Sequence, residues 1–312
     1  MNVKVIINPA AGREEAVLFK MNAFFREHNI DYHVSVTTPK LSATEATQDA
    51  LSKGFDAVVG YGGDGTLMEI ANALCDSETP LLIVPGGTSN TLSQELHIPP
   101  SIPKALSLLL PEYGRPQKVD MAQFGDRYYL TALGVGIPAQ WALEADRDLK
   151  NKYGLLAYIV TGVRATIKAK PALYHLTLDG KTVQTQGMAC MISNIGSSGF
   201  RGLRLGKAIS NTDGILDVLV FKLKLFESAP DTTEAMLRSM RKNRRLFFEH
   251  YRAKEIVLSA EPPQFAMVDG EPIGSTPLHI TVAPHSLAIY SPTERTRTLW
   301  DKIVTSLVDD EF

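Results

Sequence analysis

Apolar and polar positions along the first third of the chain alternate between two spacings. Short runs of β-branched residues are followed by longer segments in which apolar residues recur every three or four positions. The first spacing predicts strands and the second predicts amphipathic helices. Strands and helices in regular alternation favour an α/β domain with a parallel sheet. The predicted strand and helix pairs are 3–7 with 14–27, 32–37 with 42–52, 57–61 with 66–74, and 81–84 with 88–96.

After about Asp120 the pattern changes to β-rich runs separated by turns, which predicts a mostly antiparallel β-sandwich or barrel-like domain. Helices are expected at 153–168 and 231–241, and a last helix at 293–308. We therefore expect an α/β domain over 1–125, a β-sandwich domain over 126–292, and a segment 293–312 whose helix packs back on the first domain. The strand candidates are 128–136, 174–186, 187–195, 215–223, 254–260, 278–283 and 286–292.

Composition and charge narrow the class of protein. The 312 residues are 44% apolar and 21% charged, as in well-packed globular proteins. A net charge of −2 does not favour a polyanion, so no nucleic-acid partner is expected. Cys75 and Cys190 are too few for a disulfide framework, which fits a reducing compartment. No export signal is visible, and the uncharged run 153–163 is shorter than the roughly 20 residues that span a bilayer. A cytoplasmic location is expected.

A glycine-rich stretch, VVGYGGDGTLMEIANAL, occupies residues 58–74. Gly60, Gly62 and Gly65 satisfy G-x-G-x-x-G between a predicted strand and a predicted helix, so a dinucleotide-binding Rossmann loop is the first hypothesis. The stretch follows the third predicted strand rather than the first, and the next strand ends at 84–87 without a ribose-binding acid. Both facts count against that hypothesis. No G-x-x-x-x-G-K-[ST] occurs, which excludes a P-loop.

A single acid, Asp64, lies among these glycines. Thr66 and Glu69 form a T-x-x-E pattern that predicts a capping box, a helix start at the glycine turn, and free amides that attract an anion. An acid beside a phosphate repels it unless a cation lies between them, so Asp64 indicates a nucleotide that arrives with Mg²⁺. The alternative is that Asp64 is only a tight-turn residue, as Asp-Gly often is.

Two other predicted strand ends carry similar loops, NPAAG at 8–12 and PGGTSNT at 85–91. In a parallel sheet the loops that follow the strands leave from the same edge. Glycines let the backbone approach a ligand closely, while Thr88, Ser89 and Thr91 offer hydroxyl groups and helix caps. Three such loops together predict a phosphate-binding site.

GGDGT followed by PGGTSN resembles the diacylglycerol kinase catalytic family, in its bacterial soluble lipid kinase branch. NAD kinases and 6-phosphofructokinases are distant relatives of that family by fold. The resemblance implies a nucleotide-binding α/β domain, a β-sandwich domain, and transfer of a phosphoryl group from ATP to a lipid hydroxyl in the interdomain cleft. Further matching segments are VDMAQF at 119–124, KYGLLAY at 152–158, NTDGILDV at 211–218 and VDGEP at 268–272.

The same resemblance assigns roles to individual residues. It implies that Asp64 lies near the reacting phosphates and that Glu271 is the general base, which agrees with the need of an attacking hydroxyl for a carboxylate. Asp213 resembles a ligand of a structural Mg²⁺, joined by the carbonyls of Ser210 and Ile215, with Asp217 as a weaker candidate and Asp120 in the metal and water network. The nucleotide-binding residues that it implies are Asn8, Pro9, Ala10, Ala11, Gly12, Thr38, Gly62, Gly63, Asp64, Gly65, Thr66, Leu67, Met68, Gly87 and Thr88.

Each acid has an ordinary alternative, because Asp-Gly is common in hairpin turns. Asp179-Gly180 lies between two strand candidates and is expected to be only a turn. The chain also departs from the family pattern at 134–138 and 197–214, both in the β-rich part where the lipid is expected. These departures leave the identity of the acceptor open.

Residues 238–245, RSMRKNRR, carry five positive charges in eight positions and precede Leu246, Phe247 and Phe248. One interpretation is a docking patch for an anionic membrane surface, to which each basic side chain contributes about 1 kcal/mol. The other is a solvated helix face paired with acids. The sequence supports both equally.

The leading hypothesis is an ATP- and Mg²⁺-dependent kinase whose acceptor is diacylglycerol, a related glycerolipid or a sphingoid base. An NAD kinase-like enzyme is an alternative that shares GGDGT, and a non-catalytic lipid or nucleotide sensor on the same fold is another. Intact Asp64 and Glu271 favour an enzyme over a sensor. A peripheral membrane contact and a homodimer are both left open.

Overall fold

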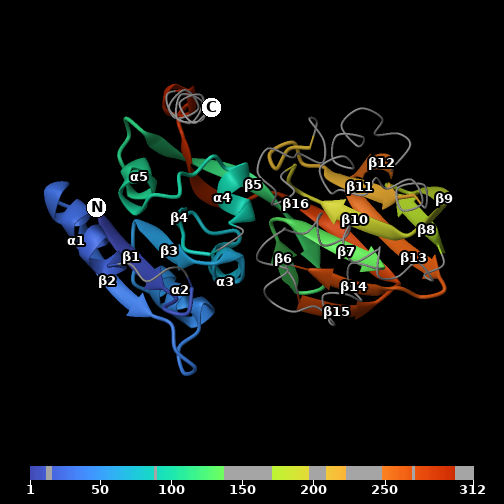
Figure 1. Cartoon of the computed structure of the whole chain (residues 1–312), viewed down its shortest axis with the longest axis horizontal. Helices are drawn as coiled ribbons and strands as arrows, with labels where there is room; N and C mark the ends of the chain where they lie inside the picture. The colour runs from blue at the N-terminus through green and yellow to red at the C-terminus, as the bar shows by residue number, and fades with distance from the viewer. Residues whose placement is uncertain are drawn as a thin grey trace, which may run out of the picture. The chain divides into compact units, whose positions relative to one another are not determined.

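A computed structural model describes residues 1–11, 16–87, 90–136, 171–196, 209–222, 248–268 and 271–298. The chain divides into two compact units (Figure 1). Unit 1 is Met1–Val119 together with the chain from His285 onward, and unit 2 is Asp120–Pro284. The chain passes from one unit to the other within the strands 114–124 and 278–292, whereas the boundaries were expected at 125 and 292. Long strands that carry the chain from one unit into the other explain this difference.

The sheet of unit 1 has the strand order β2-β1-β3-β4, and its neighbouring strands are parallel. Every residue of β3 and β4 is buried, which places the core of the unit around these central strands. The last part of the chain adds to this sheet, because Ile289 of β16 pairs in parallel with Leu81. The four strands are β1 (Asn2–Ile7), β2 (Asp31–Val36), β3 (Ala57–Gly62) and β4 (Leu81–Pro85).

The helices of unit 1 connect these strands and pack on the sheet. Parallel crossovers are right-handed, so the β1-to-β2 crossover and the β3-to-β4 crossover lie on opposite faces. Contacts between α2 and α3, and between α1 and α5, agree with two helical layers. The helices are α1 (Val17–Glu27), α2 (Ala43–Ser52), α3 (Asp64–Leu74), α4 (Thr91–Glu95), α5 (Ile102–Leu106) and a 3₁₀ turn η1 (Ser107–Leu109).

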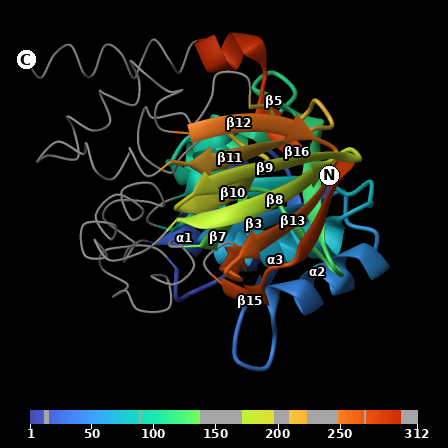
Figure 2. The ribbon, with the colours of Figure 1, turned by 90° about the vertical axis from the view of Figure 1, so that its right-hand side faces the viewer.

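Unit 2 is built from antiparallel strands in two sheets. One contains β9, β8, β13 and the first part of β16, and the other has the order β12-β11-β10-β7-β14-β15. Figure 2 shows β12 and β11 as neighbouring strands. The sheets meet closely, since a Cβ atom added to Gly136 of β7 would lie 2.8 Å from the buried Tyr174 hydroxyl of β8.

The strands of unit 2, with the two that lead into and out of it, share extended backbone and alternate side-chain direction. They are β5 (Gly114–Phe124), β6 (Arg127–Tyr129), β7 (Ala132–Gly136), β8 (Ala172–Leu178), β9 (Lys181–Gly187), β10 (Ala189–Ser193), β11 (Leu216–Phe221), β12 (Phe248–Ala253), β13 (Glu255–Glu261), β14 (Phe265–Val268), β15 (Glu271–Ser275) and β16 (Leu278–Pro292).

The predicted fold class, a parallel α/β domain followed by an antiparallel β-sandwich, is confirmed. Asp179 and Gly180 both have positive φ, 48° and 81°, at the β8–β9 turn, as expected for a residue pair that only turns a hairpin. The separate strands expected at 278–283 and 286–292 are wrong. They form one strand, β16, which continues through His285 at φ 54°.

Some expected elements lie outside the described residues, namely the helices at 153–168 and 231–241. Of the helix expected at 293–308, residues 294–298 are helical and those beyond 298 lie outside the described part. Within the described ranges, no helix combines the length and the apolar character needed to cross a bilayer.

Candidate functional site

The strand order of unit 1 changes direction between β1 and β3. The chain leaves β1 toward β2 on one side and leaves β3 toward β4 on the other, which is the arrangement where open α/β sheets bind ligands. Asn8, the first residue after β1, connects this strand end to β3 and α3. Its Nδ2 atom donates to the Thr66 hydroxyl of α3 at 2.7 Å, and its backbone N–H donates to Tyr61 at 2.9 Å. The NPAAG and GGDGT loops are therefore adjacent.

Helix α3 begins two residues earlier than the sequence pattern predicts. Gly63 is its N-cap and makes no side-chain cap bond, and Asp64 is its first helical residue. The capping box expected from Thr66 and Glu69 is wrong, because Thr66 is already inside the first turn. Its hydroxyl accepts from Asn8, and Glu69 accepts from the backbone N–H of Ala43 at 3.2 Å. The glycine turn therefore leads directly into helical backbone.

The Asp64 carboxylate lies against the start of a second helix, α4. It accepts from the backbone N–H groups of Thr91 at 3.2 Å and Leu92 at 3.5 Å. The first amides of a helix lack internal partners and carry a partial positive charge. Asp64 thus lies in the first turn of α3 and at the amino end of α4. The backbone dipoles of both helices stabilise its negative charge. Its hydrogen bonds to Thr91 and Leu92 connect the GGDGT loop with the PGGTSN loop.

The third loop, PGGTSN, is closed by Asn90. Its Oδ1 atom accepts from the Gly87 N–H at 2.9 Å, and its Nδ2 donates to the Gly87 carbonyl at 2.6 Å. Asn90 has φ 46°, a left-handed conformation that asparagine tolerates better than most residues. A Cβ atom added to Gly87 would lie 2.8 Å from the Cα of Gly63. The GGDGT and PGGTSN loops therefore touch through their backbones. Sequence reasoning overlooked Asn90, although an asparagine after two glycines is typical of such a turn.

The remaining nucleotide-binding candidates differ in whether their side chains are buried or exposed. Ala10 and Ala11 form a turn on Asn8, through bonds from their N–H groups to its Oδ1 and carbonyl oxygens. Leu67 and Met68 are 0% and 6% exposed, so their side chains pack in the core rather than facing a ligand. Thr38, beyond β2, accepts from the Lys40 N–H at 3.2 Å. Gly12 and Thr88 lie outside the described residues.

In unit 2, Asp120 is fully buried and is held from several directions. Its N–H donates to the Asn211 carbonyl at 2.6 Å, and its own carbonyl accepts from Asn194 at 2.8 Å. Its carboxylate accepts from the Gly214 N–H at 2.6 Å. The VDMAQF and NTDG segments are therefore brought together. Asn194 belongs to this cluster but has no motif that would identify it in the sequence.

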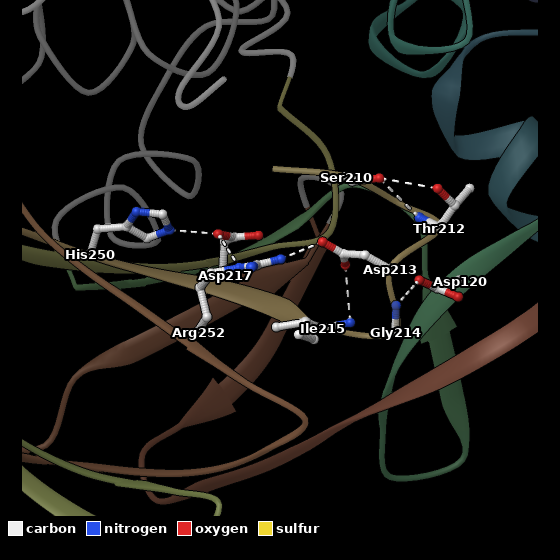
Figure 3. A network of polar contacts seen from close by, with 9 residues as sticks. All are labelled: Asp120, Ser210, Thr212, Asp213, Gly214, Ile215, Asp217, His250 and Arg252. Carbon is white, nitrogen blue, oxygen red and sulfur yellow. Dashed lines mark hydrogen bonds and ion pairs between the residues drawn. The ribbon is translucent and has the colours of Figure 1, made fainter. Parts of the chain in front are cut away.

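The Asp213 carboxylate already has partners among protein groups (Figure 3). One oxygen accepts from the Ile215 N–H at 3.2 Å, and the other is paired with the Arg252 guanidinium. The Ser210 hydroxyl is shared with Thr212 at 3.1 Å. Among the described residues, no group of three His, Cys, Asp or Glu side chains could hold a metal ion. The Asp213 carboxylate is thus occupied by protein groups, and the Mg²⁺ site expected from Asp213, Ser210, Ile215 and Asp120 stays a prediction.

Glu271, the expected general base, is the first residue of β15. Its side chain is 71% exposed, and its Oε2 atom lies 3.3 Å from the Nη1 atom of Arg127 on β6. The Glu271 carboxylate is therefore open to solvent and paired with a cation from another strand. The neighbouring Asp269 and Gly270, and the basic segment 238–245, lie outside the described residues.

Comparison with protein families identifies two matches that follow each other along the chain. Residues 2–124 match the diacylglycerol kinase catalytic domain. Residues 131–291 match the YegS C-terminal NAD kinase beta sandwich-like domain. The two matches correspond closely to the α/β part and to the antiparallel part.

Similar proteins include diacylglycerol kinases of two bacteria. The chain is 29% identical over 225 residues to a diacylglycerol kinase of Bacillus subtilis, covering 70% of this chain and 73% of that protein. It is 26% identical over 297 residues to a diacylglycerol kinase of Staphylococcus aureus, covering 93% and 92%. An uncharacterized protein of Synechocystis is 29% identical over 310 residues, covering 93% and 70%.

Solved structures show the same architecture. A crystal structure of a candidate diacylglycerol kinase from Bacillus anthracis has a TM-score of 0.79 at 26% identity, covering 95% of this chain and 96% of that one. A diacylglycerol kinase structure from the same organism has a TM-score of 0.70 at 24% identity, covering 95% and 98%, and supports the fold alone.

Proposed function

Because the chain belongs to the diacylglycerol kinase catalytic-domain family, we propose that it transfers the γ-phosphoryl group of ATP to the hydroxyl of diacylglycerol or of a related glycerolipid or sphingoid base. The observation that carries this proposal is the convergence of three glycine-containing loops after β1, β3 and β4. Contacts of Asn8 with Thr66, and of Gly87 with Gly63, join them.

Unit 1 supplies the nucleotide site in this proposal. Backbone N–H groups at the start of α3 are suited to phosphate oxygens, because glycine neighbours let a ligand approach the main chain. ATP arrives with Mg²⁺ as part of the substrate. The charge of Asp64 is shared between the amides of α4 and that cation, which keeps the carboxylate close to the triphosphate without net repulsion.

Glu271 of unit 2 acts as the general base. The acceptor hydroxyl loses its proton to the Glu271 carboxylate while its oxygen forms a bond to the γ-phosphorus. The bond from that phosphorus to the β,γ-bridging oxygen breaks, and ADP leaves. Arg127 lies beside Glu271 and offers a positive charge to the phosphoryl oxygens or to the carboxylate itself. Positioning and electrostatic stabilisation thus supply most of the rate enhancement.

The test is a kinase assay with purified protein, labelled ATP, Mg²⁺ and a whole bacterial lipid extract, with each phosphorylated product identified by its mass. We expect a phosphorylated lipid, and we expect Asp64→Ala to lower the rate by at least about 100-fold. Asp31→Ala, which removes an exposed carboxylate from β2, is the matched control and keeps the wild-type rate.

Two further arms separate the alternatives. Phosphorylation of NAD in place of any lipid would identify an NAD kinase-like enzyme. Affinity for ATP with Mg²⁺ but no transfer to any lipid or to NAD would identify a sensor. Melting curves of Asp64→Ala, measured alongside, distinguish lost chemistry from a loosened α4, because the loss of an acceptor at a helix start costs about 1 kcal/mol.

A further inference from the structure

A cluster of charged side chains spans β11, β12 and the loop before β11. The antiparallel register places Arg252 directly opposite Asp217, and His250 two residues along the same strand. Side chains two positions apart share a face, and opposed residues share it with them. The three side chains therefore meet by sheet geometry, and Asp213 reaches the same place from the preceding loop (Figure 3).

Asp217 is the member of the cluster that most needs a counter-charge. Its side chain is 0% exposed, whereas those of His250, Arg252 and Asp213 are 33%, 39% and 30% exposed. An ionised carboxylate removed from water is costly unless a cation or several hydrogen bonds stabilise it. Its Oδ1 atom lies 2.5 Å from the His250 Nε2 atom and 3.5 Å from the Arg252 Nε atom. Its Oδ2 atom has no hydrogen-bond partner in the described part of the chain.

The Arg252 guanidinium lies between two carboxylates. Its Nε side faces Asp217, and its terminal nitrogen pairs with Asp213. A planar, permanently charged group with several N–H donors can serve two carboxylates at once. A divalent cation could also join two carboxylates with nearby carbonyl oxygens, which is the type of site expected for Asp213. The guanidinium and such a cation would compete for the same carboxylate oxygens.

We propose that the Arg252 guanidinium is a built-in cation that replaces a structural divalent ion at Asp213 and Asp217. Unit 2 then keeps its loop at 210–215 closed without a metal. The loop also matters for Asp120, because Gly214, next to Asp213, donates its N–H to the Asp120 carboxylate. Arg252 thereby positions the NTDG segment against β5. This inference concerns folding and metal affinity and does not depend on the proposed kinase activity.

The test compares melting temperatures of the full chain, without nucleotide, in EDTA, in millimolar MgCl₂ and in millimolar CaCl₂. We expect the wild-type melting temperature to be the same in all three solutions. Arg252→Met should melt about 5 °C lower in EDTA, because Asp213 and the buried Asp217 lose the cation that they share and only His250 stays beside Asp217. Calcium should restore much of that loss, because it can occupy the vacated position between the carboxylates. Calorimetric titration should detect calcium binding to Arg252→Met and not to the wild type.

Three comparisons complete the design. Lys254→Met removes an exposed cation two residues away and should match the wild type in every solution. Arg252→Lys should recover part of the stability without calcium. Asp213→Asn combined with Arg252→Met should lose the calcium response, because one of the two carboxylates is gone.

Several results would overturn the proposal. A wild-type melting temperature that falls in EDTA or rises with Mg²⁺ would assign the counter-charge to a metal ion. An Arg252→Met variant that melts like the wild type, or one that is destabilised but does not respond to calcium, would contradict the replacement. If Arg252→Met does not fold, Arg252→Lys and the wild-type metal series still decide the question.

Discussion

The glycine-containing loops of unit 1 and the charged cluster of unit 2 stabilise acidic side chains in different ways. In unit 1, Asp64 is held by backbone N–H groups at the start of α4, and the loops touch through glycine backbones. In unit 2, Asp213 and Asp217 are held mainly by side chains of another strand. A backbone-built site tolerates changes in most of its side chains, whereas a side-chain-built site depends on each partner.

This difference has a consequence for function. Most substitutions leave the main-chain amides in place, so a backbone-built site can keep its ligand while its side chains change; proline, which lacks the N–H, is the exception. Side chains can be exchanged one at a time, so the part of the molecule built from them is freer to diverge. The departures of this chain from the family pattern at 134–138 and 197–214 belong to the second part.

The largest expected effect concerns Glu271, a single side chain with a proposed chemical role. Glu271→Gln should lower kcat by about 10²- to 10⁴-fold, because glutamine cannot accept the proton of the acceptor hydroxyl. Its affinity for ATP with Mg²⁺ should not change, since the proposed nucleotide site lies in unit 1. Steady-state kinetics and calorimetric ATP titration measure the two quantities.

Glu261→Gln is the matched control for this variant, because Glu261 is an exposed glutamate at the end of another strand of unit 2. It should retain wild-type kcat. Turnover by Glu271→Gln at the wild-type rate would remove Glu271 from the mechanism and would leave unit 2 without an identified base.

A smaller effect is expected at Asn90, which closes the PGGTSN loop. Asn90→Ala should destabilise the protein by about 1–2 kcal/mol, because it loses two hydrogen bonds and leaves alanine in a left-handed conformation. Asn90→Gly should lose less stability, since glycine adopts that conformation freely. Both variants should raise the KM for ATP about tenfold, equivalent to about 1.4 kcal/mol.

Asn29, which also has a positive φ (52°), lies in the turn after α1 and provides the control. Asn29→Ala should lower the melting temperature but leave the KM for ATP unchanged. Equal changes in KM for the Asn29 and Asn90 variants would show that the PGGTSN loop has no special relation to the nucleotide.

The smallest effect is a pH dependence in unit 2. Burial raises the pKa of the Glu249 carboxyl, but hydrogen bonds from Lys222, Thr185 and Tyr251 lower it by more, so the pKa falls from 4.5 to about 2. A carboxyl whose pKa is depressed by folding contributes stability above its unfolded pKa. This stability is lost as the pH falls from 4.5 toward 2.

Melting temperatures measured across that range should therefore fall more steeply for the wild type than for Glu249→Gln. Glu112→Gln, an exposed control in unit 1, should follow the wild-type curve. Parallel curves for the wild type and Glu249→Gln would exclude Glu249 as a source of acid sensitivity.

The sequence predicts unit 1 better than unit 2 because its signals are local. Strand and helix spacing fixes the order of the elements, and the glycine loops lie beside the strands they follow. The error at Thr66 has a physical cause. A T-x-x-E pattern also occurs within the first turn of a helix. A glycine N-cap such as Gly63 has no capping side chain, so the sequence pattern does not mark it as the start of the helix.

The cluster of unit 2 could not be predicted in the same way. Asp217 and Arg252 are 35 positions apart, 252 minus 217, and only the register of β11 with β12 makes them neighbours. The sequence of β12, FEHYRA, is rich in polar and charged residues, so it does not stand out as a strand. Side chains that meet only through the pairing of distant strands leave no recognisable pattern in the local sequence.

The approach of Gly87 to Gly63 sets a strict steric limit on unit 1. The nearest atom to an added methyl group at position 87 is a main-chain carbon, which cannot rotate away as a side chain could. Any residue larger than glycine would have to wedge the two loops apart. The limit therefore falls on position 87 and not on position 63, where an added Cβ atom would lie 3.8 Å from the Gly87 Cα, an ordinary contact distance.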